Sequence, residues 1–162
     1  MSIDFSKFDK AVDTKAIEEA KANPPKGKDT PAGEYIAKFE KLELTETKDH
    51  RPMVKVQLRV VEAGESASDE VIEYLSHFKD KKPCLFMNRV IYGTKNDPAM
   101  IASILGWLDT LQTETLPEFI SYSQFADNLL DIFEEVADTV ELAVSYDPDA
   151  FNSIEVNEVF DV

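Results

Sequence analysis

Two segments after Gly33 alternate apolar and polar residues with a period of two, which is typical of half-buried β-strands. The first, residues 34–46, changes phase midway, so we predict a β-bulge near Glu40 or Lys41 that keeps both apolar sets on one face. The second, residues 52–62, alternates without a break, and the polar residues 45–51 predict a turn between the two. The apolar positions are Tyr35, Ala37, Phe39, Leu42 and Leu44, then Val54, Val56, Leu58 and Val60. A long hairpin is therefore expected.

Helical patterns follow in three places. Residues 68–81 predict a helix with Ser66 or Ser68 as its N-cap, because acids follow the cap and apolar residues share one face. Cations are expected at the C-terminal end of this helix, where the macrodipole favours them; these are Lys79, Lys81 and Lys82. Two more helices are predicted near 97–112, which opens with a proline in its first turn, and near 123–136.

Three further strands complete the pattern. They are predicted at residues 84–92, at 140–144 and at 151–156, and a turn at 146–149 separates the last two. Five short antiparallel strands with helices between the third and the fourth predict an OB-fold-like β-barrel, an α+β architecture. Periodicity alone leaves other small barrels and α+β folds open.

The first 32 residues read as an arm and linker, followed by one domain over residues 33–162. Apolar residues before position 24 are irregularly spaced, although Asp13 or Thr14 could cap a short helix. Pro24, Pro25 and Pro31, with polar residues between them, then predict a stiff, polar linker.

Composition narrows the class of protein. Hydrophobic residues make up 43% of the 162, which is enough for a packed core. No run approaches the ~18 apolar residues of a membrane span, and the N-terminus lacks the pattern of a secretory signal. A single cysteine, Cys84, fits a reducing cytosol and is expected to be a buried strand residue. The expectation is a soluble, cytoplasmic protein.

Charge is distributed unevenly along the chain. The net charge is −15, and all 17 Lys and Arg lie between Lys7 and Lys95. Residues 98–162 contain 14 acids and no Lys or Arg, so they account for −14 of the total. Such asymmetry indicates either a solvated acidic surface or a preference among partners.

Several segments, in order and at compatible spacing, resemble a family of bacteriophage proteins encoded among recombination and replication functions. The segments are Ile3–Asp9, Pro31–Tyr35, Lys41–Leu44, Arg51–Val60, Phe125–Ile132 and Ile154–Asp161. The resemblance implies an OB-like barrel that binds single-stranded DNA in the host cell cytoplasm, with phage or host replication and recombination proteins as partners. The chain departs from the family pattern in a longer segment at residues 64–82 and in a glycine-poor loop before Pro98.

Binding single-stranded DNA requires cations for the phosphates and aromatic faces for the bases. The candidates all lie in the first 97 residues: Lys38, Lys41, Lys55, Arg59, Lys79, Lys81, Lys82, Phe86, Arg89, Tyr92 and Lys95. Alternatively, Phe86 and Tyr92 are core residues and the cations are ordinary surface charges. The acidic second half would repel DNA, and a homo-oligomer would lengthen a short site.

Catalysis has little support in the sequence. The two histidines lie in different contexts, and no metal-ligand, nucleophile or phosphate-loop motif occurs, so we expect no enzyme activity and no cofactor. A protein-binding adaptor or DNA mimic using the acidic half is the main alternative, and a carboxylate nuclease is a weaker one. Near the C-terminus, Glu158, Phe160 and Asp161 resemble a partner-recruiting acidic tail, but the alternation there favours a last strand.

Overall fold

The computed structural model describes residues 30–162, which form an antiparallel sheet of five strands and three helices. In chain order the elements are β1 (Gly33–Glu46), β2 (Pro52–Ala63), α2 (Asp69–Ser76), β3 (Cys84–Val90), α3 (Asp97–Asp109), α4 (Tyr122–Val136), β4 (Val140–Asp147) and β5 (Ser153–Asp161). The helix expected near Asp13 lies outside the described residues. Within residues 30–162, no helix has the length and apolar character needed to cross a membrane.

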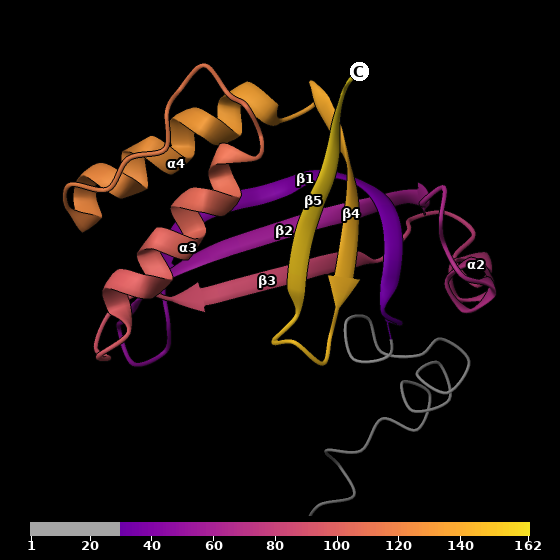
Figure 1. The fold of residues 1–162 in the computed structure, drawn as a ribbon, viewed down its shortest axis with the longest axis horizontal. Helices are drawn as coiled ribbons and strands as arrows, with labels where there is room; N and C mark the ends of the chain where they lie inside the picture. The colour runs from indigo at the N-terminus through magenta and orange to yellow at the C-terminus, as the bar shows by residue number, and fades with distance from the viewer. Residues whose placement is uncertain (1–29) are drawn as a thin grey trace, which may run out of the picture.

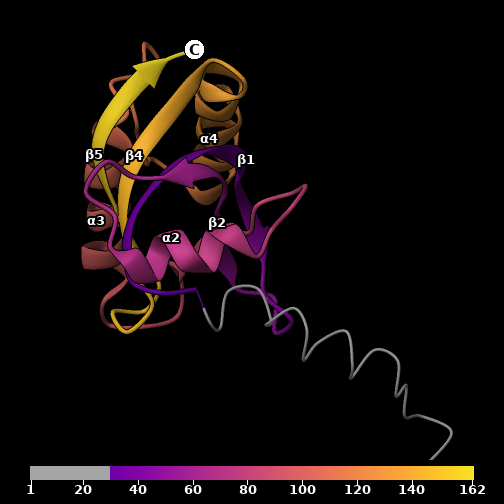
Figure 2. The same ribbon diagram turned by 90° about the vertical axis from the view of Figure 1, so that its right-hand side faces the viewer.

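The strands are ordered β3-β2-β1-β4-β5, and every neighbouring pair is antiparallel. The central strand, β1, pairs with β2 and, over residues 33–37, also with β4. Figure 1 shows β4 and β5 crossing steeply in front of β2 and β3. Figure 2 shows that the sheet is strongly curved, so that it has a concave and a convex side.

The predicted barrel is not closed. Within the described residues, the edge strands β3 and β5 approach each other but form no hydrogen-bonded ladder. The indole Nε1 of Trp107 donates to the Ile154 carbonyl on β5 at 2.8 Å, so α3 occupies an acceptor that a neighbouring strand would otherwise use. The architecture is an open, curled sheet in an α+β fold.

Register slips bend β1. One slip between Phe39 and Lys41 leaves Glu40 as an extra residue, which confirms the predicted bulge. Because of this extra residue, Phe39 and Leu42 both point into the core, with exposed fractions of 5% and 1%. Bulges also increase strand twist. The bent β1 can therefore pair with β2 on one side and with β4 on the other.

One continuous core lies between the concave side of the sheet and the helices. Its largest fully buried side chains include Tyr35, Phe125, Leu42, Leu58, Leu85, Leu108, Leu129, Ile132, Leu142 and Ile154. Burying each of these stabilises the fold by roughly 1.5–3 kcal/mol. The core also extends to Thr30, whose Oγ1 lies 2.9 Å from the Tyr74 hydroxyl, so the packed part of the chain includes residues assigned to the arm.

The helix between β2 and β3 begins as predicted but is shorter. The Val71 N–H donates to Ser68 Oγ at 3.4 Å, and α2 ends at Ser76. Phe78 folds back so that its ring centroid lies 5.2 Å from that of Tyr74, while Pro83 already pairs with β2 through its carbonyl. Residues 77–83 must therefore leave the helix to reach β3, and the prediction of lysines in its last turn is wrong.

Helix α3 is fixed against the sheet. The Asp97 carboxylate accepts hydrogen bonds from the N–H groups of Gly93 and Thr94, at 2.8 and 3.1 Å, and so holds the loop before the helix. At the other end, Trp107 packs edge-on against Phe39 with 6.2 Å between ring centroids. Trp107 thus packs its helix against the sheet.

The connection between α3 and α4 runs back along α4. Ser121 caps α4 by accepting the Gln124 N–H at 3.1 Å. Three α4 side chains bind the backbone of the connection. Gln124 binds residues 118 and 120, Asn128 binds residues 116 and 118, and Glu135 accepts from the N–H groups of residues 114 and 115. This connection has a defined conformation without regular secondary structure.

The predicted turn between the last two strands is present but longer. The Asp149 N–H donates to Asp147 Oδ1 at 3.0 Å, and Phe151 lies in this turn rather than in β5, which begins at Ser153. The assignment of Phe151 to a strand is therefore wrong. The end of the chain belongs to β5, which confirms a strand there rather than a tail.

Candidate nucleic-acid interface

The outer face is the surface of β1, β2 and β3 directed away from the core. Residues directly opposite each other on antiparallel strands share one side of a sheet. The register therefore places four rows across this face: Lys38, Arg59 and Cys84; Lys41, Gln57 and Phe86; Glu43, Lys55 and Asn88; and Thr45, Met53 and Val90. Five of the predicted DNA-binding residues thus lie together on the outer face, beside the acids Glu40 and Glu43. Cys84 is buried, as predicted.

Arg59 is bound to protein groups. Its Nη1 donates to the Lys82 carbonyl at 2.8 Å and its Nη2 to Glu40 Oε1 at 3.1 Å, and only 18% of its side chain is exposed. The bond to Glu40 raises the pKa of Arg59. Arg59 therefore joins β1, β2 and the α2–β3 loop, while Lys38 and Lys41 remain exposed for other contacts.

The α2–β3 loop extends the cationic surface. Because Arg59 binds the carbonyl of Lys82, this loop adjoins the end of the outer face that carries Lys38. Lys82 turns its Nζ back to the Phe78 carbonyl at 2.9 Å, whereas Lys79 and Lys81 are exposed. The structure thus brings two further candidates to the same side of the molecule.

A pocket of 530 Å³, the Phe151 pocket, opens between β3 and the β4–β5 turn. It is lined by Phe86, Asn88, Arg89, Val90, Met100, Phe151 and Asn152. Its volume lies in the range of ~300–1,000 Å³ that small-molecule sites occupy. Aromatic surface and hydrogen-bonding groups therefore meet where the outer face ends at the edge of the sheet.

Phe151 is both exposed and conformationally unfavourable. Its side chain is 87% exposed, its φ is 56°, and the φ of Asn152 is 54°. Left-handed backbone costs a residue with a Cβ roughly 1–2 kcal/mol, and a bulky residue adopts it rarely. Packing therefore does not explain a phenylalanine at this position. The sequence pattern placed Phe151 in a strand, although an aromatic so close to Pro148 was a usable signal.

Arg89 lies on the opposite side of β3 from Phe86. It pairs with Val54, a core position, and its Nη1 donates to the Asn88 carbonyl at 3.0 Å. Burial lowers the pKa of Arg89, but an arginine remains charged at neutral pH. Because β3 is an edge strand, side chains from both of its sides reach the Phe151 pocket.

The last two candidates lie in the β3–α3 loop. Tyr92 is 52% exposed, with its ring centroid 5.8 Å from that of Tyr122, and Lys95 is exposed. A Cβ on Gly93, whose φ is 92°, would lie 3.6 Å from Arg51 Cδ, so this loop packs beside the β1–β2 turn. Tyr92 is therefore not a core residue.

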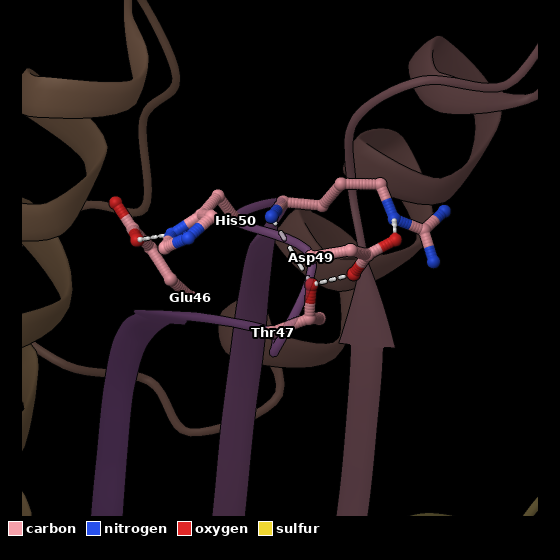
Figure 3. A network of polar contacts seen from close by, with 5 residues as sticks. Glu46, Thr47, Asp49 and His50 are labelled. Atoms are coloured by element: carbon pink, nitrogen blue, oxygen red, sulfur yellow. Dashed lines mark hydrogen bonds and ion pairs between the residues drawn. The ribbon is translucent and has the colours of Figure 1, made fainter.

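Polar contacts order the β1–β2 turn, as Figure 3 shows. Thr47 Oγ1 donates to the Asp49 carboxylate, Arg51 Nε pairs with Asp49 at 2.9 Å, and His50 Nδ1 lies 3.1 Å from Glu46. The hydrogen bond from Thr47 is the largest cause that lowers the pKa of Asp49, and a backbone hydrogen bond and then the charge of Arg51 add to it. The turn is therefore a defined feature at the end of the outer face.

The acidic half forms a different surface. Glu158 and Phe160 pair with Ala143 and Glu141, so they lie on the β4–β5 part of the sheet, and Asp161 ends β5. The elements α3, α4, β4 and β5 contain no Lys or Arg. Among residues 30–162, no group of three or more His, Cys, Asp or Glu side chains could hold a metal ion.

No protein-family model matches the sequence, and no curated protein matches it. The site is therefore characterised by its own geometry: a cationic outer face, an aromatic pocket at its edge and an acidic surface elsewhere.

Proposed function

We propose that this protein binds single-stranded DNA, without enzymatic activity, on a sheet of the OB type. The OB-fold is a partly open five-stranded barrel that binds oligonucleotides with strands 2 and 3 and with the loops between strands 1 and 2 and strands 4 and 5. The strand order supports this comparison, because β1 lies between β2 and β4 and the sheet opens between β3 and β5. The corresponding surfaces are the outer face, the β1–β2 turn and the turn that carries Phe151.

The observation that carries the proposal is the exposed Phe151 beside Phe86 at the edge of a cationic face. A base stacked on an aromatic ring contributes roughly 1–3 kcal/mol, and every base offers such a face. One or two bases would bind at the Phe151 pocket, and the phosphates would follow Lys55 and Lys41 across the outer face. Lys38 and the exposed lysines of the α2–β3 loop would extend this path.

The acidic elements would confine DNA to this side of the protein. Residues 98–162 carry a formal charge of −14, and fields of one sign repel a polyanion. The proposed biological setting is phage replication or recombination in the host cytoplasm, where the protein would coat exposed single strands. That setting rests on the family resemblance alone.

Fluorescence anisotropy with a labelled oligo(dT) of ~30 nucleotides and a matching duplex tests the proposal. We expect tight binding of the single strand alone, weakening with salt at a log–log slope of about −0.7 per phosphate contacted. Phe151→Ala should weaken binding, whereas Phe160→Ala, which removes an exposed phenylalanine from the acidic surface, should not. Absence of binding at low salt, or equal effects of the two substitutions, would overturn the proposal.

A protein-binding role as a DNA mimic or adaptor is the second candidate. It is favoured by the 14 acids and the absence of Lys and Arg in residues 98–162. This function predicts no affinity for oligo(dT) and competition with DNA for a basic partner. The same titration therefore separates the two candidates.

A further inference from the structure

The outer edge of β5 is a second feature that points to a ligand. Antiparallel strands direct successive residues alternately toward and away from a given neighbour. The Val162 N–H donates to the Thr139 carbonyl at 2.9 Å, so Val159 and Asp161 direct their backbone groups away from β4. Within residues 30–162, no strand pairs with this edge. A row of backbone donors and acceptors is therefore available there.

A groove runs along this edge, between β5 and the residues that follow α3. Two hollows of 480 and 260 Å³ form it, and both are lined by Gln112 and Val159. The larger hollow has an apolar floor that includes Leu111, Val136 and Val140. This β5 groove offers apolar contacts beside the unpaired backbone, which is the combination that an added strand requires.

The negative charge around the groove indicates which kind of ligand can bind there. Glu114 and Asp161 line the larger hollow, Glu158 lines the smaller one, and neither is lined by Lys or Arg. A second copy of β5 would bring like charges together, which destabilises a strand pair, and DNA would be repelled. An extended peptide with alternating apolar and cationic residues complements both the floor and the rim.

We propose that the β5 groove binds an extended, Lys- or Arg-containing segment of a protein partner, which adds to the sheet as a sixth strand beside β5. Side chains of an added strand lie on the same side as the residues opposite them. Apolar residues of the partner therefore lie beside Val159, and cationic residues lie beside Glu158. This site is separate from the outer face and does not depend on the proposed binding of DNA.

The test uses the full chain and a peptide of alternating lysine and valine, seven residues long, as the probe. Amide exchange measured by NMR on the free protein should be fast for Val159 and Asp161 and slow for Val162. Added peptide should protect the first two amides. The same peptide with N-methylated valines, which lacks their backbone donors, should bind at least about tenfold more weakly, and a glutamate–valine peptide should not bind.

Charge variants provide the matched comparison. Glu158→Lys should weaken peptide binding about tenfold, whereas Glu155→Lys, on the same strand but outside both hollows, should leave binding unchanged. Slow exchange of Val159 in the free protein would show that another segment or a second copy already occupies the edge. That result, equal binding of the N-methylated peptide, or equal effects of the two charge variants would each overturn the proposal.

Discussion

Phe151 provides the sharpest test, because one substitution should raise stability and weaken binding at once. Phe151→Gly relieves left-handed strain of roughly 1–2 kcal/mol, while the freedom of glycine in the unfolded chain costs about 0.5–1 kcal/mol. Since the ring is 87% exposed, little apolar burial is lost. We therefore expect the free energy of unfolding to rise by up to about 1.5 kcal/mol, and the Tm by about 2–4 °C per kcal/mol.

The same substitution removes the stacking surface. Loss of one stacked base should weaken oligo(dT) binding by roughly 1–3 kcal/mol, or about 5- to 150-fold in Kd. Phe151→Ala separates the two effects, since it removes the ring but keeps a Cβ at φ 56°. Thermal unfolding and anisotropy should show the stability gain in the glycine variant and weak binding in both. A lower Tm in the glycine variant, or unchanged binding in both, would refute the reasoning.

Three further predictions concern contacts that hold the fold and the β1–β2 turn. Trp107→Phe keeps the ring contact but loses the 2.8 Å bond to the Ile154 carbonyl, so urea titration should show a loss of about 1 kcal/mol. Ser121→Ala removes the N-cap of α4 and should cost about 1 kcal/mol; unchanged stability would contradict the capping role. Thr47→Val should move the pKa of Asp49 back toward its ordinary value in an NMR titration. Because the folded pKa is lowered, the stability from this carboxylate is complete above the ordinary pKa and is lost as the pH falls through the folded pKa.

The sequence pattern predicted the elements well where burial alone decides them. The phase change between Phe39 and Leu42 required an extra residue, and the structure has one at Glu40. The N-cap at Ser68, one of the two serines expected there, also followed from local rules. The end of α2 did not, because Phe78 continues the helical apolar stripe even though it contacts Tyr74 from outside the helix.

The candidate site was harder to predict, because it depends on which strand forms the edge of the sheet and which turn lies beside that edge. Residues 86 and 89 differ by an odd number, so strand parity alone places them on opposite sides of β3. They reach one pocket only because that strand is an edge and the β4–β5 turn lies beside it. Phe151 looked like a strand residue because its backbone conformation depends on the turn. Arg59 looked like a free cation because its partners, Glu40 and the Lys82 carbonyl, are distant in sequence.

The connection between α3 and α4 has a consequence for how this protein tolerates change. Loops usually accept substitutions more readily than the helices they join. Here, side chains of Gln124, Asn128 and Glu135 fix the backbone of the loop through hydrogen bonds. The exposed Leu116 and Ile120 can vary without altering that backbone, whereas a single change at Asn128 on the helix would remove the hydrogen bonds to the Leu116 carbonyl and the Glu118 N–H. Substitutions should therefore be tolerated less well on the side of α4 that binds the loop than in the loop itself.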